Sequence, residues 1–213
     1  MITLNSRGPV YLVDDEPALL KALSRLLKAE GFMVKAFGSA LDFLGSSVAS
    51  GPGCVVVDEA MPGMTGSELQ HSLQNLRSSL AVVFLTGNGD IPMSVRAIKR
   101  GAVDFLTKPV KDEELIAAIR AGLKKTGEMV VERSEIKVLE ERHALLTGRE
   151  REVMLEVVRG LPNKQIAGKL EIVEQTVKVH RSRVMHKMGA ESLADLVLFA
   201  EKLGIAGNRS PKA

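Results

Sequence analysis

Short apolar runs alternate with amphipathic stretches over residues 1–124, and this alternation constrains the fold more than any other feature of the chain. Continuous apolar runs at 10–13, 54–57 and 81–85 are typical of strands buried on both faces of a sheet. Shorter runs predict strands over 33–36 and 103–106, and the intervening stretches predict helices over 19–27, 41–44, 68–76, 93–100 and 112–124. This order of strands and helices predicts an α/β fold with a doubly wound, five-stranded parallel sheet.

The last part of the chain, residues 144–213, has only helical patterns. Thr147 and Glu150 have the spacing of a capping box at the start of the first helix. A short helix over 163–170, a tight connection and a longer helix over 174–188 form a helix-turn-helix arrangement. A fourth helix is expected over 193–203.

Between these two parts, residues 125–143 mix glutamates with basic residues. Two interpretations stay open for this segment: a solvated helical linker, or a short coiled-coil seam that helps dimerisation. The seam would be formed by Met129, Ile136, Leu139, His143 and Leu146. Two heptads are too few to decide. We therefore predict a first domain over 1–124, a helical linker over 125–143 and an all-helical domain over 144–213.

Composition excludes several classes of protein. No apolar run approaches the roughly 18 residues of a membrane helix, and no signal peptide precedes the first strand, so we expect a cytoplasmic protein without membrane contact. The single cysteine, Cys54, excludes an internal disulfide framework. The net charge of +3 arises from residues 144–213, whose balance is +4, so a polyanion is expected to bind there.

Polar side chains follow four of the predicted strands. Because ligands of doubly wound sheets bind at the carboxyl ends of the strands, these side chains are expected to converge. Carboxylates brought so close need a cation between them, and oxygen ligands favour Mg²⁺. An aspartate can also act as the nucleophile that forms an aspartyl-phosphate, with an amine and a hydroxyl stabilising the phosphoryl oxygens. The residues are Asp14 and Asp15, Asp58, Thr86, and Lys108.

Residues 10–124 resemble the receiver domain of two-component response regulators, whose fold is flavodoxin-like with strand order 2-1-3-4-5. The resemblance rests on the segments 13–16, 57–66, 86–87 and 101–109. It implies that Asp58 accepts a phosphoryl group from a sensor histidine kinase. It also implies a Mg²⁺ (or Mn²⁺) site and a phosphoryl-sensing set. The metal would be held by Asp15, Asp58 and the backbone carbonyl of Ala60, with Asp14 acting through water; the phosphoryl group would be stabilised or sensed by Lys108, Thr86 and Phe105.

The helix predicted over 174–188 has two distinct faces on a helical wheel. Val177, Val184 and Met188 share the face expected to be buried. The remainder carries basic side chains and no acid after Thr176, which favours entry into the major groove of double-stranded DNA. The candidate DNA contacts are Gln175, Thr176, Lys178, Val179, Arg181, Ser182, Arg183, His186 and Lys187.

Residues 146–167 and 176–181 resemble the LuxR-type helix-turn-helix, and the whole chain resembles FixJ-type members of the NarL/FixJ response regulators. The loop 86–90 and the turn 161–164 fit that subfamily. Three positions depart from its pattern. Glu171 replaces a turn glycine, Val173 replaces a capping serine, and Ser182 is shorter than the polar side chain usual there. These departures concern DNA affinity rather than the fold.

The sequence thus predicts a transcription factor, not an enzyme, in which phosphorylation of Asp58 drives dimerisation and promoter binding. Its expected partners are the kinase, DNA, RNA polymerase and a second copy of the chain. One alternative is a phosphatase or phosphotransferase of the haloacid-dehalogenase type; such enzymes carry a second acid two residues after the nucleophile, where this chain has Ala60. The other is a constitutive DNA-binding protein with a silent receiver.

Overall fold

The computed structural model describes residues 8–87 and 91–205. The chain forms two compact units, Met1–Val131 and Glu132–Ala213. One helix, α5 (Asp112–Ala144), contributes residues to both. The helix predicted over 112–124 and the helical linker predicted over 125–143 are therefore continuous. Within the described residues, no helix is both long and apolar enough to cross a membrane.

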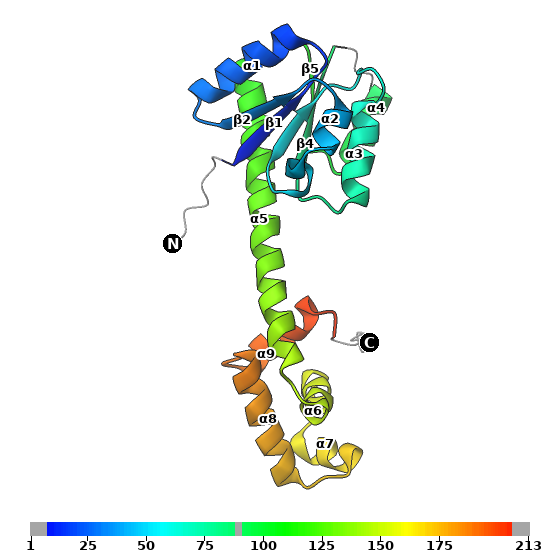
Figure 1. Cartoon of the computed structure of the whole chain (residues 1–213). Helices are drawn as coiled ribbons and strands as arrows, with labels where there is room; N and C mark the ends of the chain where they lie inside the picture. The colour runs from blue at the N-terminus through cyan, green and yellow to red at the C-terminus, as the bar shows by residue number, and fades with distance from the viewer. Residues whose placement is uncertain (1–7, 88–90, 206–213) are drawn as a thin grey trace. The chain divides into compact units, whose positions relative to one another are not determined.

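The N-terminal unit contains a five-stranded parallel sheet in the order β2-β1-β3-β4-β5, which confirms the predicted fold (Figure 1). Register places Val13 beside Val57, and Val57 beside Phe84. The strands are β1 (Pro9–Val13), β2 (Met33–Phe37), β3 (Cys54–Val57), β4 (Ala81–Thr86) and β5 (Asp104–Thr107). The fifth strand lies one residue later than predicted.

Helices cover both faces of this sheet and enclose two hydrophobic cores. One core lies under α2 (Ala40–Leu44), α3 (Gly66–Asn75) and α4 (Ile91–Lys99). The other lies under α1 (Pro17–Ala29) and the first half of α5. A short 3-10 helix, η1 (Ser47–Ser50), follows α2. Three strands are buried along most or all of their length because apolar side chains fill both cores, as the continuous apolar runs require.

Close packing explains why α5 contains a glycine within its first half. A Cβ at Gly122 would lie 2.9 Å from the Cys54 Sγ and 3.1 Å from the Ala81 Cβ. The absent side chain lets α5 approach β3 and β4, and burial raises the pKa of the Cys54 thiol to about 12. Cys54 is consequently an inert packing residue at pH 7.

The C-terminal unit is helical and uses the end of α5 as part of its core. Leu139 and Leu146 are buried against it, so two positions of the hypothetical coiled-coil seam are already covered within this unit. The Thr147–Glu150 capping box is present as predicted. The helices are α6 (Gly148–Val158), α7 (Asn163–Leu170), α8 (Glu174–Met188) and α9 (Leu193–Lys202).

Candidate functional site

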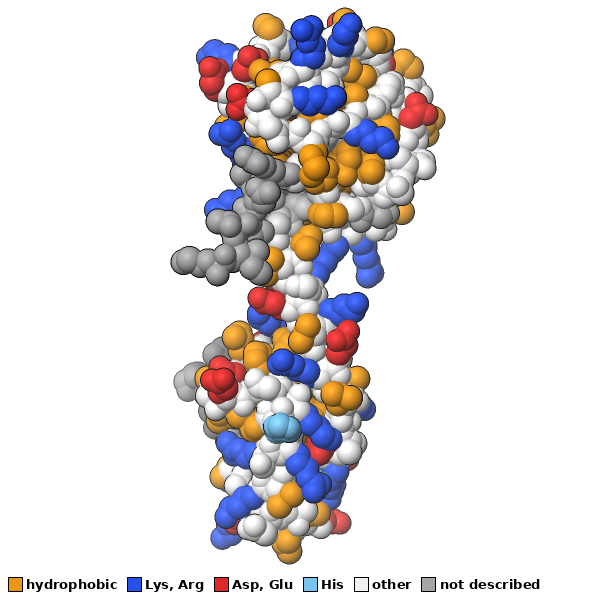
Figure 2. All heavy atoms as spheres, turned by 60° about the vertical axis from the view of Figure 1, so that its left-hand side comes forward, with side chains coloured by type: hydrophobic (Ala, Val, Ile, Leu, Met, Phe, Trp, Pro, Cys, Tyr) orange, Lys and Arg blue, Asp and Glu red, His pale blue; other side chains and the backbone are white. Residues whose placement is uncertain are grey.

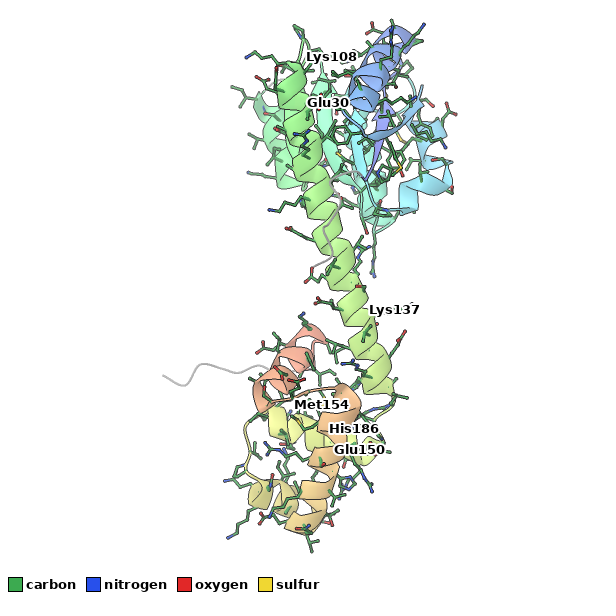
Figure 3. The ribbon with its side chains drawn as sticks, turned by 90° about the vertical axis from the view of Figure 1, so that its left-hand side faces the viewer. Glu30, Lys108, Lys137, Glu150, Met154 and His186 are labelled. Carbon is green, nitrogen blue, oxygen red and sulfur yellow. The ribbon has the colours of Figure 1, made fainter. Side chains whose placement is uncertain are left out.

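The carboxyl end of the sheet brings together four of the side chains singled out in the sequence. Asp14 and Asp58 are 5% and 7% exposed, and Thr86 is fully buried at the end of β4. The Lys108 ammonium donates to Asp14 Oδ2 at 2.7 Å and lies 3.5 Å from Asp58 Oδ1. Figure 3 labels Lys108 at this end of the N-terminal unit. Asp15, by contrast, is exposed.

Electrostatics keep Lys108 charged although it is partly buried. Burial alone would lower its pKa, but the hydrogen bond and charge of Asp14, with the charge of Asp58, raise the pKa above its ordinary value. The cation offsets part of the repulsion between the two carboxylates. Asp58 Oδ1 still accepts no hydrogen bond from any described residue. A buried carboxylate oxygen without a donor is suited to a further ligand.

The segment after β3 is shaped to present Asp58. A Cβ at Gly66 would lie 2.6 Å from the Asp58 carbonyl oxygen, so only glycine fits there. The Glu59 carboxylate accepts hydrogen bonds from the Ser67 backbone amide at 3.0 Å and hydroxyl at 2.9 Å. Sequence reasoning assigned no role to Gly66 or Glu59; the Thr65–Glu68 capping box, which is formed, was the available signal for this loop-to-helix junction.

Phe105 lies beside the site on β5. Its ring stacks on Phe84 with centroids 5.7 Å apart and an interplanar angle of 29°. Phe105 is only partly buried, whereas Phe84 is fully buried. The loop 86–90, whose sequence fits the FixJ-type subfamily, includes residues 88–90, which lie outside the described residues.

The donor set fits a hard cation that completes its shell with water or phosphate. The described residues contain no group of three or more His, Cys, Asp or Glu side chains that could hold a metal by themselves. Mg²⁺ does not require such a group, because it commonly binds one or two carboxylates and keeps several waters. Asp58 Oδ1, which accepts no hydrogen bond, and the buried Asp14 carboxylate therefore fit Mg²⁺ as a partly hydrated ion.

The C-terminal unit presents the second candidate surface on α8. Val177, Val184 and Met188 are buried, which confirms the predicted core face of this helix. The outward positions carry the polar and basic side chains, and Figure 2 shows Lys and Arg gathered on this unit. Of the candidate DNA contacts, the exposed ones are Gln175, Lys178, Val179, Ser182, Arg183 and His186, and the partly buried ones are Thr176, Arg181 and Lys187.

Three of these basic side chains already have partners within the unit. Lys178 lies 3.6 Å from Glu174, one turn away. Arg181 donates to Asn163 Oδ1 at 3.2 Å. Lys187 donates to Glu150 Oε2 at 2.6 Å, and Glu150 is only 2% exposed. Lys187 therefore contributes to the stability of the unit whether or not it also contacts DNA.

The turn between α7 and α8 shows how the departures in sequence are accommodated. Glu171 adopts left-handed backbone angles, φ +54° and ψ +44°, where a glycine would be unstrained. The Arg149 guanidinium donates to the carbonyl of Leu170, the residue before it. Val173 stands at the N-cap of α8, and its side chain has no oxygen to accept from the first amides.

Comparison with known proteins gives a consistent result for both units. Residues 10–120 match the family model for the response regulator receiver domain, and residues 144–200 match that for bacterial regulatory proteins of the luxR family. The response regulator protein TodT of Pseudomonas putida is 44% identical over 194 residues, covering 91% of this chain and 86% of TodT. The transcriptional regulatory protein FixJ of Azorhizobium caulinodans is 42% identical over 198 residues, covering 93% and 94%.

The fold of this chain is also similar to solved structures of response regulators. The response regulator StyR matches with a TM-score of 0.79 at 44% identity, covering 92% of this chain and 99% of StyR. Full-length FixJ from B. japonicum matches with a TM-score of 0.57 at 38% identity, covering 93% and 98%.

Proposed function

Because the chain belongs to the FixJ-type response regulators, which join a receiver domain to a LuxR-type DNA-binding domain, we propose that phosphorylation of Asp58 controls its binding to promoter DNA. Members of this family are transcription factors and not enzymes, so the dehalogenase-type alternative is excluded. The kinase that donates the phosphoryl group and the DNA that receives the output are the partners this architecture implies.

The observation that carries the proposal is the buried oxygen of Asp58, which accepts no hydrogen bond and lies 3.5 Å from the Lys108 ammonium. The carboxylate attacks the phosphorus of a phosphohistidine, and the histidine leaves as the phosphoryl group is transferred. Lys108 then has a stronger anionic partner than Asp14, because the new group carries about −1.5 to −2 charge. The ammonium is already held within 3.5 Å of the acceptor, so little reorganisation is needed.

Mg²⁺ is the cofactor we propose for this step. Receiver domains typically bind it at the acidic site, and here Asp15, Asp58 and the Ala60 carbonyl would hold it, with Asp14 acting through water. The bound ion would supply charge neutralisation for the phosphoryl oxygens. Mn²⁺ has the same preference for oxygen ligands and would serve in its place.

Thr86 and Phe105 provide a route from the phosphoryl group to the surface. A shift of the buried Thr86 hydroxyl toward the new oxygens would leave space next to Phe105, which is only partly buried. The adjacent helix α4 exposes Ile91, Val95 and Ile98, which are 80%, 44% and 46% accessible. We propose that this α4–β5 surface forms the homodimer, since exposed apolar patches mark interaction sites.

Dimerisation would then present two copies of α8 to two half-sites in the major groove. Lys178 and Val179 are exposed and would contact bases, whereas Arg181 and Arg183 would hold phosphates. RNA polymerase is the further partner expected of a DNA-bound transcription factor. The protein acts in the cytoplasm under this proposal, where kinase output and promoter DNA meet.

The decisive experiment compares the wild type with Asp58→Asn, and uses Asp112→Asn as a matched control at an exposed aspartate of α5. Each protein is incubated with Mg²⁺ and a small phosphodonor. Intact mass spectrometry reports the phosphoryl adduct, and light scattering reports the oligomeric state. Selection from a pool of random DNA duplexes identifies the sequences that the protein binds.

We expect the wild type and Asp112→Asn to gain one phosphoryl group, dimerise and bind duplexes with paired half-sites more tightly. Asp58→Asn should do none of these. Equal DNA affinity with and without the adduct would overturn the proposal and favour the constitutive binder with a silent receiver.

A further inference from the structure

The end of the recognition helix α8 is held by the last turns of α5, and we propose that Arg142 is a positioning residue through which α5 sets α8 for DNA binding. Arg142 donates from Nη1 to the Met188 carbonyl oxygen at 3.0 Å. The inference rests on the proposed function, because it concerns how the phosphorylated receiver reaches the DNA-binding surface.

The contact lies at the C-terminal end of α8, where a positive charge is most stabilising. The last carbonyls of α8 have no partner within the helix, and the helix dipole puts partial negative charge there. The planar guanidinium meets both needs at once, as a donor and as a charge. Arg142 is only partly exposed, so solvent screens this interaction less than it would on the surface.

Gly189 is required by the same contact. It follows Met188 and ends α8 with φ +67°, a conformation that L side chains rarely adopt. A Cβ at Gly189 would also lie 2.5 Å from Arg142 Nη1 and 3.0 Å from its Cζ. The glycine therefore both ends the helix and leaves room for the guanidinium.

A second set of contacts ties the same end of α8 to the junction after α5. Lys187 donates to the Leu145 carbonyl at 3.1 Å as well as to Glu150, which Figure 3 labels next to α8. Two turns before Arg142 in α5, Glu135 pairs with Lys202 of α9 at 2.7 Å. The contacts of Arg142 and Lys187 lie at the C-terminal end of α8, away from Lys178 and Val179, and so constrain the helix without occupying its exposed face.

Continuity of α5 supplies the connection to the receiver. Leu115, Ile119 and Leu123 of this helix are buried in the receiver core, and Leu139 is buried in the core of the C-terminal unit. Energetic coupling is carried by helices and packed side chains that both ends share. A change in receiver packing on phosphorylation would reach Arg142 along one hydrogen-bonded helix.

The test uses the full-length chain with Arg142→Met, Arg142→Lys and, as a matched control, Lys137→Met at an exposed position of α5. For each variant, intact mass gives the adduct and light scattering the dimer. Anisotropy gives the affinity for a duplex selected by the wild type, with and without phosphodonor, and calorimetry gives the Tm of the C-terminal unit.

Arg142→Met is expected to take the phosphoryl group and to dimerise like the wild type. The factor by which phosphorylation raises its DNA affinity should nevertheless be smaller than that of the wild type by about fivefold or more. Arg142→Lys should recover part of it, and Lys137→Met should behave as wild type. Two results would overturn the role of Arg142: an unchanged gain, or an equal loss of affinity with and without the adduct.

Gly189→Ala perturbs the same contact from the side of α8. It keeps the proposal testable if Arg142→Met fails to fold. Gly189→Ala and Arg142→Met should each reduce the rise in DNA affinity on phosphorylation. The two reductions should not add in the double variant, because both substitutions remove the same interaction. Additive losses would contradict the proposal. If the wild type itself shows no gain while carrying the adduct, the proposed function fails first, and this inference fails with it.

Discussion

Replacing Glu171 by glycine is expected to stabilise the C-terminal unit, although the change deletes a side chain. The residue stands at φ +54° in the turn before the recognition helix. This conformation costs an L residue about 1–2 kcal/mol. Glycine adopts it without strain but loses about 0.5–1 kcal/mol more conformational entropy on folding. The midpoints of these two ranges leave a gain of about 0.75 kcal/mol.

Thermal unfolding of the full chain measures this gain. Because the stabilised unit comprises residues 132–213, the Tm of its transition should rise by about 2–8 °C. The receiver transition should not move. Glu171→Gln is the matched control, since it removes the charge but keeps the Cβ, and it should leave the Tm unchanged.

An unchanged or lowered Tm for Glu171→Gly would refute the strain argument. An equal rise in both variants would show that the charge, and not the backbone, had been unfavourable. DNA affinity separates the two effects further: both variants lose a carboxylate next to α8, so both should bind DNA more tightly by similar factors.

Two other predictions concern the receiver and the capping box. Gly66→Ala should lower the stability of the receiver by about 1–3 kcal/mol and reduce the yield of adduct, because the new Cβ would meet the Asp58 carbonyl; a wild-type Tm and mass spectrum would contradict this. The hydrogen bond from Lys187, followed by that from the Thr147 amide, lowers the pKa of Glu150 from 4.5 to about 2. The stability contributed by this carboxylate is complete above pH 4.5 and is lost as the pH falls toward 2, so denaturant titrations of the C-terminal unit should show a weaker pH dependence in Glu150→Gln over that interval.

Local signals in the sequence determined most of the fold. Apolar runs and helical periodicity depend on neighbours a few residues away, and they located the strands, the order of elements and the helices of the C-terminal unit. Capping residues did the same for helix ends, as at Thr147. The convergence of Asp14, Asp58, Thr86 and Lys108 was also predictable, because parallel strands carry the residues that follow them to one edge of the sheet.

Contacts between residues distant in the chain were decided only by the tertiary structure. Lys108 pairs with Asp14 rather than with the adjacent Asp15, across 94 positions of sequence. Arg142 reaches the carbonyl of Met188 across 46 positions. Such pairings depend on which side chains the packed elements turn toward one another, and no periodic pattern encodes that. The sequence by itself thus determined which elements form and which groups meet at the sheet edge, while packing decided which charges pair and how the recognition helix is held.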